Sequence, residues 1–298
     1  MPRQFGQVKV RVGIAALIVA GGLLVAFAVH GGSGSGHWRA GCGSTPAPAA
    51  DKHASALAEA RKALLSKGND PRLELEVVDL DTCAVELSWK ADRPLPTASV
   101  VKLLIALDLI DSSGVPSGSD ASAVSDMLSA SDDQVASRLW QENGGPSIVE
   151  RQAGKLGLAN TSPPTDTGQW GSARMSPADV LTVYRHITAE LPDEERDFLT
   201  EAMESAPRNA ADGFDQHFGI PRAFEGADWA VKQGWGSSGG RRVLNTTGLV
   251  RTESRTFAVS VMTTWSKTVD WTTATTALTT ATSALKGSLA TSTNGRLR

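Results

Sequence analysis

The chain has 298 residues, of which 41% are hydrophobic and 20% charged, and its formal net charge is −3. This composition argues against a disordered chain, because so many apolar residues can build a substantial core. The near balance of 29 basic and 32 acidic residues leaves no broad basic surface to gather nucleic-acid phosphates. We therefore expect one large folded domain, or two intimately joined lobes, and no nucleic-acid partner.

Residues 12–29 form an almost uninterrupted apolar run that follows Arg3, Lys9 and Arg11. At about 1.5 Å per residue, the run is just long enough for a helix to cross a hydrocarbon core about 30 Å thick. The basic residues before it predict that its start stays in the cytoplasm and that the rest is exported. The run is either a retained transmembrane anchor or a signal peptide removed after Ala28, and both alternatives place the domain in the cell envelope or outside it.

Residues 31–50 are rich in Gly, Ser, Ala and Pro, a composition that predicts a flexible linker. The linker would join an N-terminal signal or anchor at 1–30 to a folded domain at 51–298. It also contains Cys42, which could pair with Cys83 in an oxidising compartment. Alternatively Cys42 is acylated, as at a bacterial lipoprotein junction, although the preceding sequence fits such a junction poorly.

The folded domain alternates between helical and extended patterns. Apolar spacing predicts helices at 54–65, 99–110, 132–142, 146–156, 176–188, 193–205 and 269–285. Alternating apolar and polar residues predict strands at 72–79, 84–89, 229–232, 243–250 and 256–264. Strands at both ends and a helical middle predict an α+β (mixed α/β) fold. In this fold, helices flank one antiparallel sheet built from both ends of the chain. An all-helical lobe, at about 99–206, is inserted between the two halves of the sheet.

Ser99 and Lys102 stand at the start of the helix predicted over 99–110. Residues three apart share a helix face, and the first turn presents backbone N–H groups and the positive end of the helix dipole. A desolvated lysine has a lowered pKa and can accept a serine proton. Alternatively Ser99 caps the helix and Lys102 is solvated. The same pattern at Ser283 and Lys286 lies inside a predicted helix and carries no such expectation.

Two further short motifs follow in the chain. Ser131-Asp132-Asp133 precedes a predicted helix, which it could simply cap. Lys232-Gln233-Gly234 extends a predicted strand. Each motif is common by itself, but in this order and in these settings the three resemble the motifs of the class A β-lactamases and penicillin-binding proteins.

The resemblance implies an extracytoplasmic serine hydrolase or acyltransferase that forms an acyl-enzyme on Ser99. In that reading Lys102 is the base and Ser131 relays a proton to the leaving group. The oxyanion hole would combine the backbone N–H of Ser99 with that of Trp235 or Gly236.

The same resemblance implies that five residues contact the substrate: Asp133, Lys232, Gln233, Gly234 and Trp235. Asp133 replaces the family's asparagine, and a carboxylate donates no hydrogen bond unless it is protonated. Gln233 replaces a hydroxyl residue. These two departures favour the alternative, a non-catalytic envelope protein that keeps the fold as a binding scaffold.

Class A enzymes release their acyl-enzyme with a water activated by a loop glutamate. The corresponding residues here, 160–174, contain no glutamate, and Asp166 is their only carboxylate. The resemblance therefore implies weak or absent deacylation of β-lactams.

The remaining expectations concern partners and patterns without a clear role. The substrate would be a small molecule or a peptidoglycan peptide, with β-lactams as candidates, and the chain a membrane-associated monomer. The five histidines lack ligand spacing, so we expect no metal and no other cofactor: His30, His37, His53, His186 and His217. The Gly-x-Ser-x-Gly pattern at 236–240 matches the nucleophile elbow of some hydrolases, but that elbow needs a helix after it. A strand is predicted to follow here, so we expect a hairpin loop. Three tryptophans near the motifs either line a cleft or are core residues: Trp140, Trp170 and Trp235.

Overall fold

A computed structural model describes residues 38–41, 53–67, 70–253 and 255–290 of the chain. All of them belong to one compact unit, residues 35–298. The apolar run at 12–29 and Cys42 lie outside the described residues. Cys83 is disulfide-bonded, and the chain has only one other cysteine. Among the residues described, no helix combines the length and apolar character that crossing a membrane requires.

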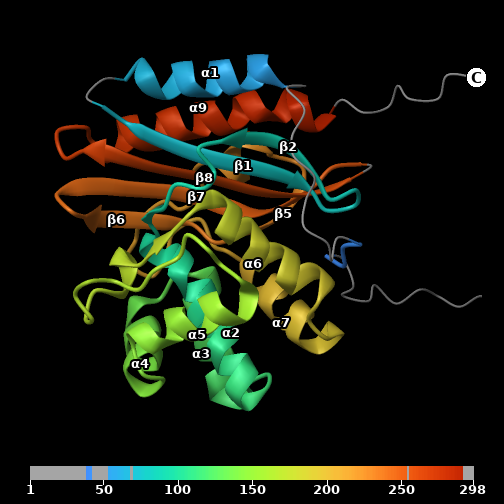
Figure 1. Cartoon of the computed structure of the whole chain (residues 1–298), viewed down its shortest axis with the longest axis vertical. Coiled ribbons are helices and arrows are strands. Elements are labelled where there is room, and N and C mark those ends of the chain that lie inside the picture. Colours follow the sequence, from blue (N-terminus) through green and yellow to red (C-terminus); the bar gives the residue numbers. More distant parts are fainter. Residues whose placement is uncertain (1–37, 42–52, 68–69, 254, 291–298) are drawn as a thin grey trace, which may run out of the picture. The chain divides into compact units, whose positions relative to one another are not determined.

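The described residues contain a six-stranded sheet whose neighbouring strands are all antiparallel (Figure 1). The strand order is β2-β1-β8-β7-β5, and β6 also pairs with β7. The strands are β1 (Arg72–Asp79), β2 (Ala84–Trp89), β5 (Asp228–Val231), β6 (Gly234–Ser238), β7 (Arg241–Arg251) and β8 (Thr256–Ser266). Strands from the two ends of the domain therefore meet in the middle of the sheet, where β1 pairs with β8.

Helices cover both faces of the sheet (Figure 1). The terminal helices α1 (Ala54–Leu65) and α9 (Trp271–Ala290) pack together on one face, with the short α8 (Ile220–Ala223). The other face carries α2 (Lys102–Ser113), α3 (Gly118–Ser129), α4 (Asp133–Glu142), α5 (Pro146–Leu156), α6 (Pro177–Ala189) and α7 (Asp193–Glu204). Short elements complete this side: β3 (Leu95–Pro96), the 3-10 turns η1 (Ala98–Val101) and η2 (Trp170–Ser172), and β4 (Arg174–Met175).

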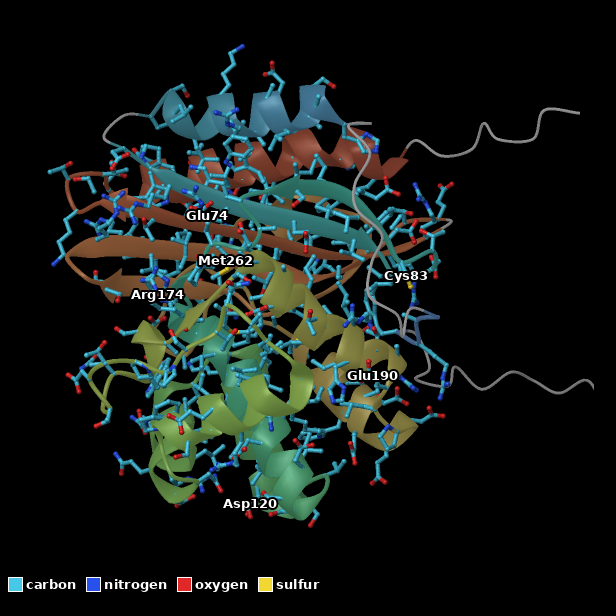
Figure 2. All side chains as sticks on the ribbon, in the orientation of Figure 1. Glu74, Cys83, Asp120, Arg174, Glu190 and Met262 are labelled. Carbon is cyan, nitrogen blue, oxygen red and sulfur yellow. The ribbon has the colours of Figure 1, made fainter. Side chains whose placement is uncertain are left out.

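The central strand β8 supplies both cores because successive side chains of a strand point to opposite faces. Phe257, Val259 and Val261 join the core beneath α1 and α9. Ala258 and Met262 join the core of the helical lobe, and Figure 2 shows Met262 between the sheet and the lobe. The expected α+β fold with an inserted helical lobe is confirmed.

The helical lobe contains one helix that the sequence pattern did not predict. α3 is rich in Gly, Ser and Asp, which favour turns over helix interiors. Its few apolar residues, including Val124, Met127 and Leu128, are nevertheless buried against the lobe. Tertiary packing therefore decides this element.

Residues 38–41 lie within the expected linker yet pack against the folded domain. Trp38 is 2% exposed, and its indole N–H donates a hydrogen bond to Glu204. The guanidinium of Arg251 lies 4.7 Å from the centre of the Trp38 ring. The backbone N–H of Ala40 donates to the carbonyl of Thr188 over 3.1 Å. This short segment thus departs from the expectation of a linker with little to bury.

Candidate active site

Ser99 lies in the tight turn η1, immediately before α2, and lines a cavity of about 350 Å³. Its neighbour Ala98 has a φ of 44°, a left-handed conformation that is strained for a residue with a side chain. Thr97 anchors the turn, because its backbone N–H and its hydroxyl both donate to the carbonyl of Ala173. Asn245 on β7 donates to the carbonyl of Thr97 over 3.0 Å. The turn is therefore held rigidly against the sheet.

Lys102, the first residue of α2, is fully buried. Its Nζ donates to the carbonyl of Ser131 over 2.7 Å, to Ser131 Oγ over 3.2 Å and to Asp133 Oδ1 over 2.5 Å. Within the described residues, no hydrogen bond joins the hydroxyl of Ser99 to Lys102. Burial lowers the pKa of Lys102, and the negative charge of Asp133 opposes that shift. Asp133, whose side chain is 66% exposed, thus favours the protonated amine.

A second buried lysine approaches the same serine from the sheet. Lys232 is fully buried, and its Nζ lies 2.9 Å from Ser131 Oγ. Burial, reinforced by the positive charge of Lys102, holds the pKa of Lys232 well below its usual value. Ser131 itself has a φ of 59°, a conformation that non-glycine residues rarely adopt. Its hydroxyl therefore bridges two amines and can pass a proton between them or to a bound molecule.

Lys232 lies between β5 and β6, at the edge of the sheet. Both strands pair with β7, and the register of the pairing does not shift between them. The backbone N–H of Lys232 donates to the carbonyl of Thr247 over 3.0 Å. Successive backbone groups of a strand point in opposite directions, so alternate residues bond to β7. By this alternation the N–H of Trp235 points away from β7, whereas that of Gly236 points toward it.

The hairpin between β6 and β7 closes through Gly239 and Gly240, which have φ values of 54° and 75°. A two-residue turn with both residues in the left-handed region is a tight hairpin turn that glycine favours. The predicted hairpin is therefore present, but its loop is only Gly239-Gly240, because residues 236–238 belong to β6.

Gln233 and Gly234, expected by resemblance to contact the substrate, make close contacts within the protein. The side-chain amide of Gln233 is buried and donates to the carbonyls of Gln216 and Phe218, at 3.0 and 2.7 Å. Neither Gln233 nor Gly234 lines the cavity at Ser99. A Cβ on Gly234 would lie 2.6 Å from the carbonyl oxygen of Thr97. In this structure Gln233 supports a loop, and Gly234 allows β6 to approach η1.

Gly234→Ala is expected to destabilise the fold by about 2–3 kcal/mol, because a backbone oxygen cannot give way as a flexible side chain can. The free energy of unfolding in urea measures this loss. Gly154→Ala is the matched control, since Gly154 is an exposed helical residue with nothing near its Cβ position. The control should gain about 0.5–1 kcal/mol. Equal stability of Gly234→Ala and the wild type would contradict the proposed close approach.

The loop at 160–174 closes one side of the cavity and supplies no acid to it. Gly168 to Ser172 line the cavity, but Asp166 does not. Asp166 instead accepts a hydrogen bond from the backbone N–H of Gly168 over 3.1 Å. Asp166 is exposed, so it is poorly placed to activate a water at Ser99.

Aromatic side chains form part of the cavity wall. Trp170 and Trp235 line it, and the Nζ of Lys102 lies 4.9 Å from the ring centre of Trp170. Trp140 is only 3% exposed and donates from its indole to the carbonyl of Thr167. Trp140 is thus a core residue that fastens the loop.

Asp212 also lines the cavity, although the sequence gave no reason to single it out. Its carboxylate accepts a hydrogen bond from the indole N–H of Trp235 over 2.9 Å. Asp212 lies outside any recognisable motif, in the loop between α7 and α8, so only the tertiary structure identifies it.

No protein-family model matches the chain. Curated relatives named "Putative lipoprotein LppW", from Mycobacterium tuberculosis and Mycobacterium bovis, are 35% identical over 170 residues. The match covers 54% of this chain and 54% of each relative, so the chain spans about half the length of the curated relatives it matches.

Solved structures match over a larger part of the chain. A class A β-lactamase from Mycobacterium abscessus superimposes with a TM-score of 0.65 at 19% identity, covering 79% of this chain and 100% of that one. PBP-A matches with a TM-score of 0.64 at 19% identity, covering 82% and 98%. A β-lactamase from Chitinophaga pinensis gives 0.65 at 16%, covering 79% and 99%. The chain has the fold of the class A β-lactamases and PBP-A, which confirms the predicted resemblance for the fold.

Proposed function

We propose that the chain is an extracytoplasmic β-lactamase-like serine hydrolase or acyltransferase that forms an acyl-enzyme on Ser99. The observation that carries the proposal is the cavity at Ser99 with two buried amines of lowered pKa behind it, Lys102 and Lys232. Ser131 lies within hydrogen-bond distance of both amines. Buried amines that lose their protons readily suit proton transfer during acyl transfer.

In the proposed reaction, Ser99 Oγ attacks a carbonyl carbon while Lys102, in its neutral form, accepts the serine proton. The backbone N–H groups of Ser99 and Trp235 donate to the oxyanion. We choose Trp235 over Gly236 because its N–H points away from β7. As the carbonyl re-forms and the bond to the leaving group breaks, Ser131 gives its hydroxyl proton to the leaving group and takes the proton that Lys102 accepted, over 3.2 Å. The acyl group then remains on Ser99.

Lys102 can serve as the base only when it is neutral and released from Asp133. The ion pair between them therefore limits acylation, and a substrate that contacts Asp133 would relieve the limit. Lys232 anchors the substrate indirectly, through Ser131. Trp170 and Trp235 offer flat apolar walls to it.

Deacylation of β-lactams is proposed to be weak or absent. Asp166 is the only carboxylate in the loop at 160–174, and it is turned toward its own backbone. A penicillin would therefore remain attached to Ser99. The natural substrate in this proposal is a small molecule or a peptidoglycan peptide.

The proposed location is the cell envelope, outside the cytoplasmic membrane. The apolar run at 12–29 and its basic flank favour export. Relatives named as lipoproteins agree with a membrane-associated protein. Either the N-terminal segment or a lipid would supply the attachment.

Intact-mass spectrometry of the full chain after incubation with a penicillin tests the acyl-enzyme. We expect a stable adduct on the wild type and complete loss of the adduct in Ser99→Ala. Ser283→Ala is the matched control, because Ser283 begins the second Ser-x-x-Lys pattern and is exposed on α9. An adduct that persists in Ser99→Ala would refute Ser99 as the nucleophile, and turnover without an adduct would favour an efficient β-lactamase.

A second candidate function is a non-catalytic binding scaffold of the cell envelope. The ion pair between Lys102 and Asp133 favours it, since a lysine held in its protonated form is no base. Neither adduct nor turnover with penicillins or with peptidoglycan peptides would favour this candidate.

A further inference from the structure

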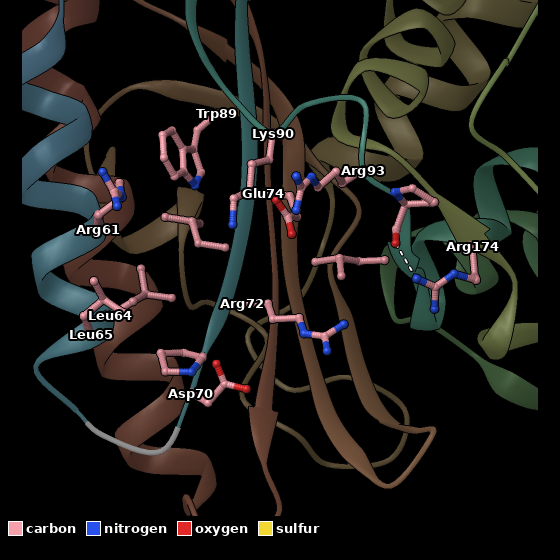
Figure 3. A pocket seen from close by; sticks show the side chains of 14 residues that line it. Arg61, Leu64, Leu65, Asp70, Arg72, Glu74, Trp89, Lys90, Arg93 and Arg174 are labelled. Carbon is pink, nitrogen blue, oxygen red and sulfur yellow. Dashed lines mark hydrogen bonds between the residues drawn. The ribbon is translucent and has the colours of Figure 1, made fainter.

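A second cavity, of about 630 Å³, lies beside α1, β1 and the turn that follows β2 (Figure 3). None of its lining residues lines the cavity at Ser99. The cavity forms beside the first residues of β1, because β2 pairs with β1 only from Leu75 onward. The preceding residues of β1, Arg72 to Glu74, therefore have an open edge that faces the cavity.

The cavity is strongly cationic. Five basic residues line it against two acidic ones, Asp70 and Glu74: Arg61, Arg72, Lys90, Arg93 and Arg174. Among the ion pairs of the described residues, none involves Arg72, Lys90 or Arg93. The chain as a whole has a net charge of −3, so this excess of positive charge is local. Unpaired guanidinium groups bind oxyanions well because their N–H donors form a fixed fork.

Glu74 lies in the wall of this cavity, and its side chain takes part in none of the ion pairs found among the described residues. It is only 4% exposed, and its Oε2 is buried without a hydrogen bond. Burial raises the pKa of Glu74 to about 7, against the lowering effect of Lys90, Arg93 and Arg72. A buried unsatisfied oxygen is costly, so a ligand that pairs with it would be stabilised.

One side of the cavity is apolar. Leu65 on α1 is 58% exposed, and Leu64 and Pro71 lie beside it in the lining. The ring of Trp89 forms the adjoining surface, with the guanidinium of Arg61 stacked 4.0 Å from its centre. A ligand that fills the cavity would therefore meet charge on one side and apolar surface on the other.

We infer that this cavity binds a small organic anion, with its acidic group among Arg72, Lys90 and Arg93 and its apolar part against Leu65 and Trp89. A protonated Glu74 donates a hydrogen bond to the anion, whereas the ionised form repels it. Binding should therefore weaken as the pH rises through the titration of Glu74. The other charged groups that face Glu74 are Arg72 from β1 and Lys90, Asp92 and Arg93 from the turn after β2.

Isothermal titration calorimetry of the full chain with benzenesulfonate tests the inference, because this probe stays ionised at every pH used. We expect saturable binding that weakens about tenfold from pH 6 to pH 8, the change that a group titrating near pH 7 produces. Arg72→Ala combined with Arg93→Ala should weaken binding at least tenfold. Glu74→Gln keeps a donor in place and should remove the pH dependence.

Controls separate this site from general charge attraction. Arg138→Ala removes an exposed cation from α4, in the helical lobe, and should leave binding unchanged. Sulfate, which lacks the apolar part, and benzyl alcohol, which lacks the charge, should each bind at least tenfold more weakly. The inference is overturned if benzenesulfonate does not saturate the protein, if the double variant binds as the wild type does, or if sulfate binds equally well.

Discussion

Lys102→Met is expected to slow adduct formation at Ser99 by about 10²–10⁴-fold, the usual contribution of a general base. The same substitution should leave the free energy of unfolding within about 1 kcal/mol of the wild type, or increase it. Lys102 is fully buried, so its amine loses its hydration on folding, and this loss destabilises the folded state. Its partner Asp133 is 66% exposed and can be hydrated once the amine is gone. The substitution should therefore slow adduct formation without lowering the stability of the fold.

The rate of penicillin adduct formation, followed by intact mass, and urea unfolding measure the two effects. Lys286→Met is the matched control: Lys286 ends the second Ser-x-x-Lys pattern and is exposed on α9. It should change neither quantity. Parallel losses of rate and stability in Lys102→Met would mean that Lys102 mainly supports the fold. An unchanged rate would assign the base to another group.

The sequence predicted the main elements of the fold because long periodic segments carry their own signal. The strands β1, β2, β7 and β8 and the terminal helices α1 and α9 fall within a few residues of the prediction. The placement of Ser99 before a buried helix was also predictable, since an extended proline-containing segment precedes an apolar run. The 3-10 turn η1 was not, because its shape depends on Thr97 hydrogen bonding across to Ala173.

Other features depend on contacts between distant segments and leave no local trace. The alternation in β1 predicted a polar face for Glu74 and Glu76, yet helices or turns cover both. Burial raises the pKa of each carboxyl group to about 7. Sequence spacing shows that a strand has a polar face but not that another layer of structure will cover it.

In the candidate site, too, some features could be predicted from the sequence and others depend on tertiary contacts. Ser99, Lys102, Ser131 and Lys232 could be selected by motif, and the structure places Ser131 Oγ within hydrogen-bond distance of both lysine amines. The motif could not show that Gln233 turns toward the loop at 216–218, because that depends on which face of the edge strand the residue occupies.

Asp133→Asn is expected to speed acylation of Ser99 about tenfold at neutral pH. The carboxylate of Asp133 raises the pKa of Lys102, in opposition to burial. Removing the charge lowers that pKa further, so at a fixed pH more of Lys102 is neutral and able to accept a proton. The rate of acylation should rise with this neutral fraction. We expect no larger change, because solvent around the exposed carboxylate screens the interaction.

The pH profile of adduct formation provides the decisive measurement. In the variant the rising limb should move to lower pH, while the plateau at high pH stays the same, since Lys102 is neutral there in both proteins. Asp120→Asn, which removes an exposed carboxylate from the first turn of α3, should leave the profile unchanged. A variant that stays inert at every pH would show that the ion pair is not what restrains Ser99. The scaffold reading would then be favoured, since Asp133 alone among the cavity residues holds Lys102 in its charged form through a direct bond.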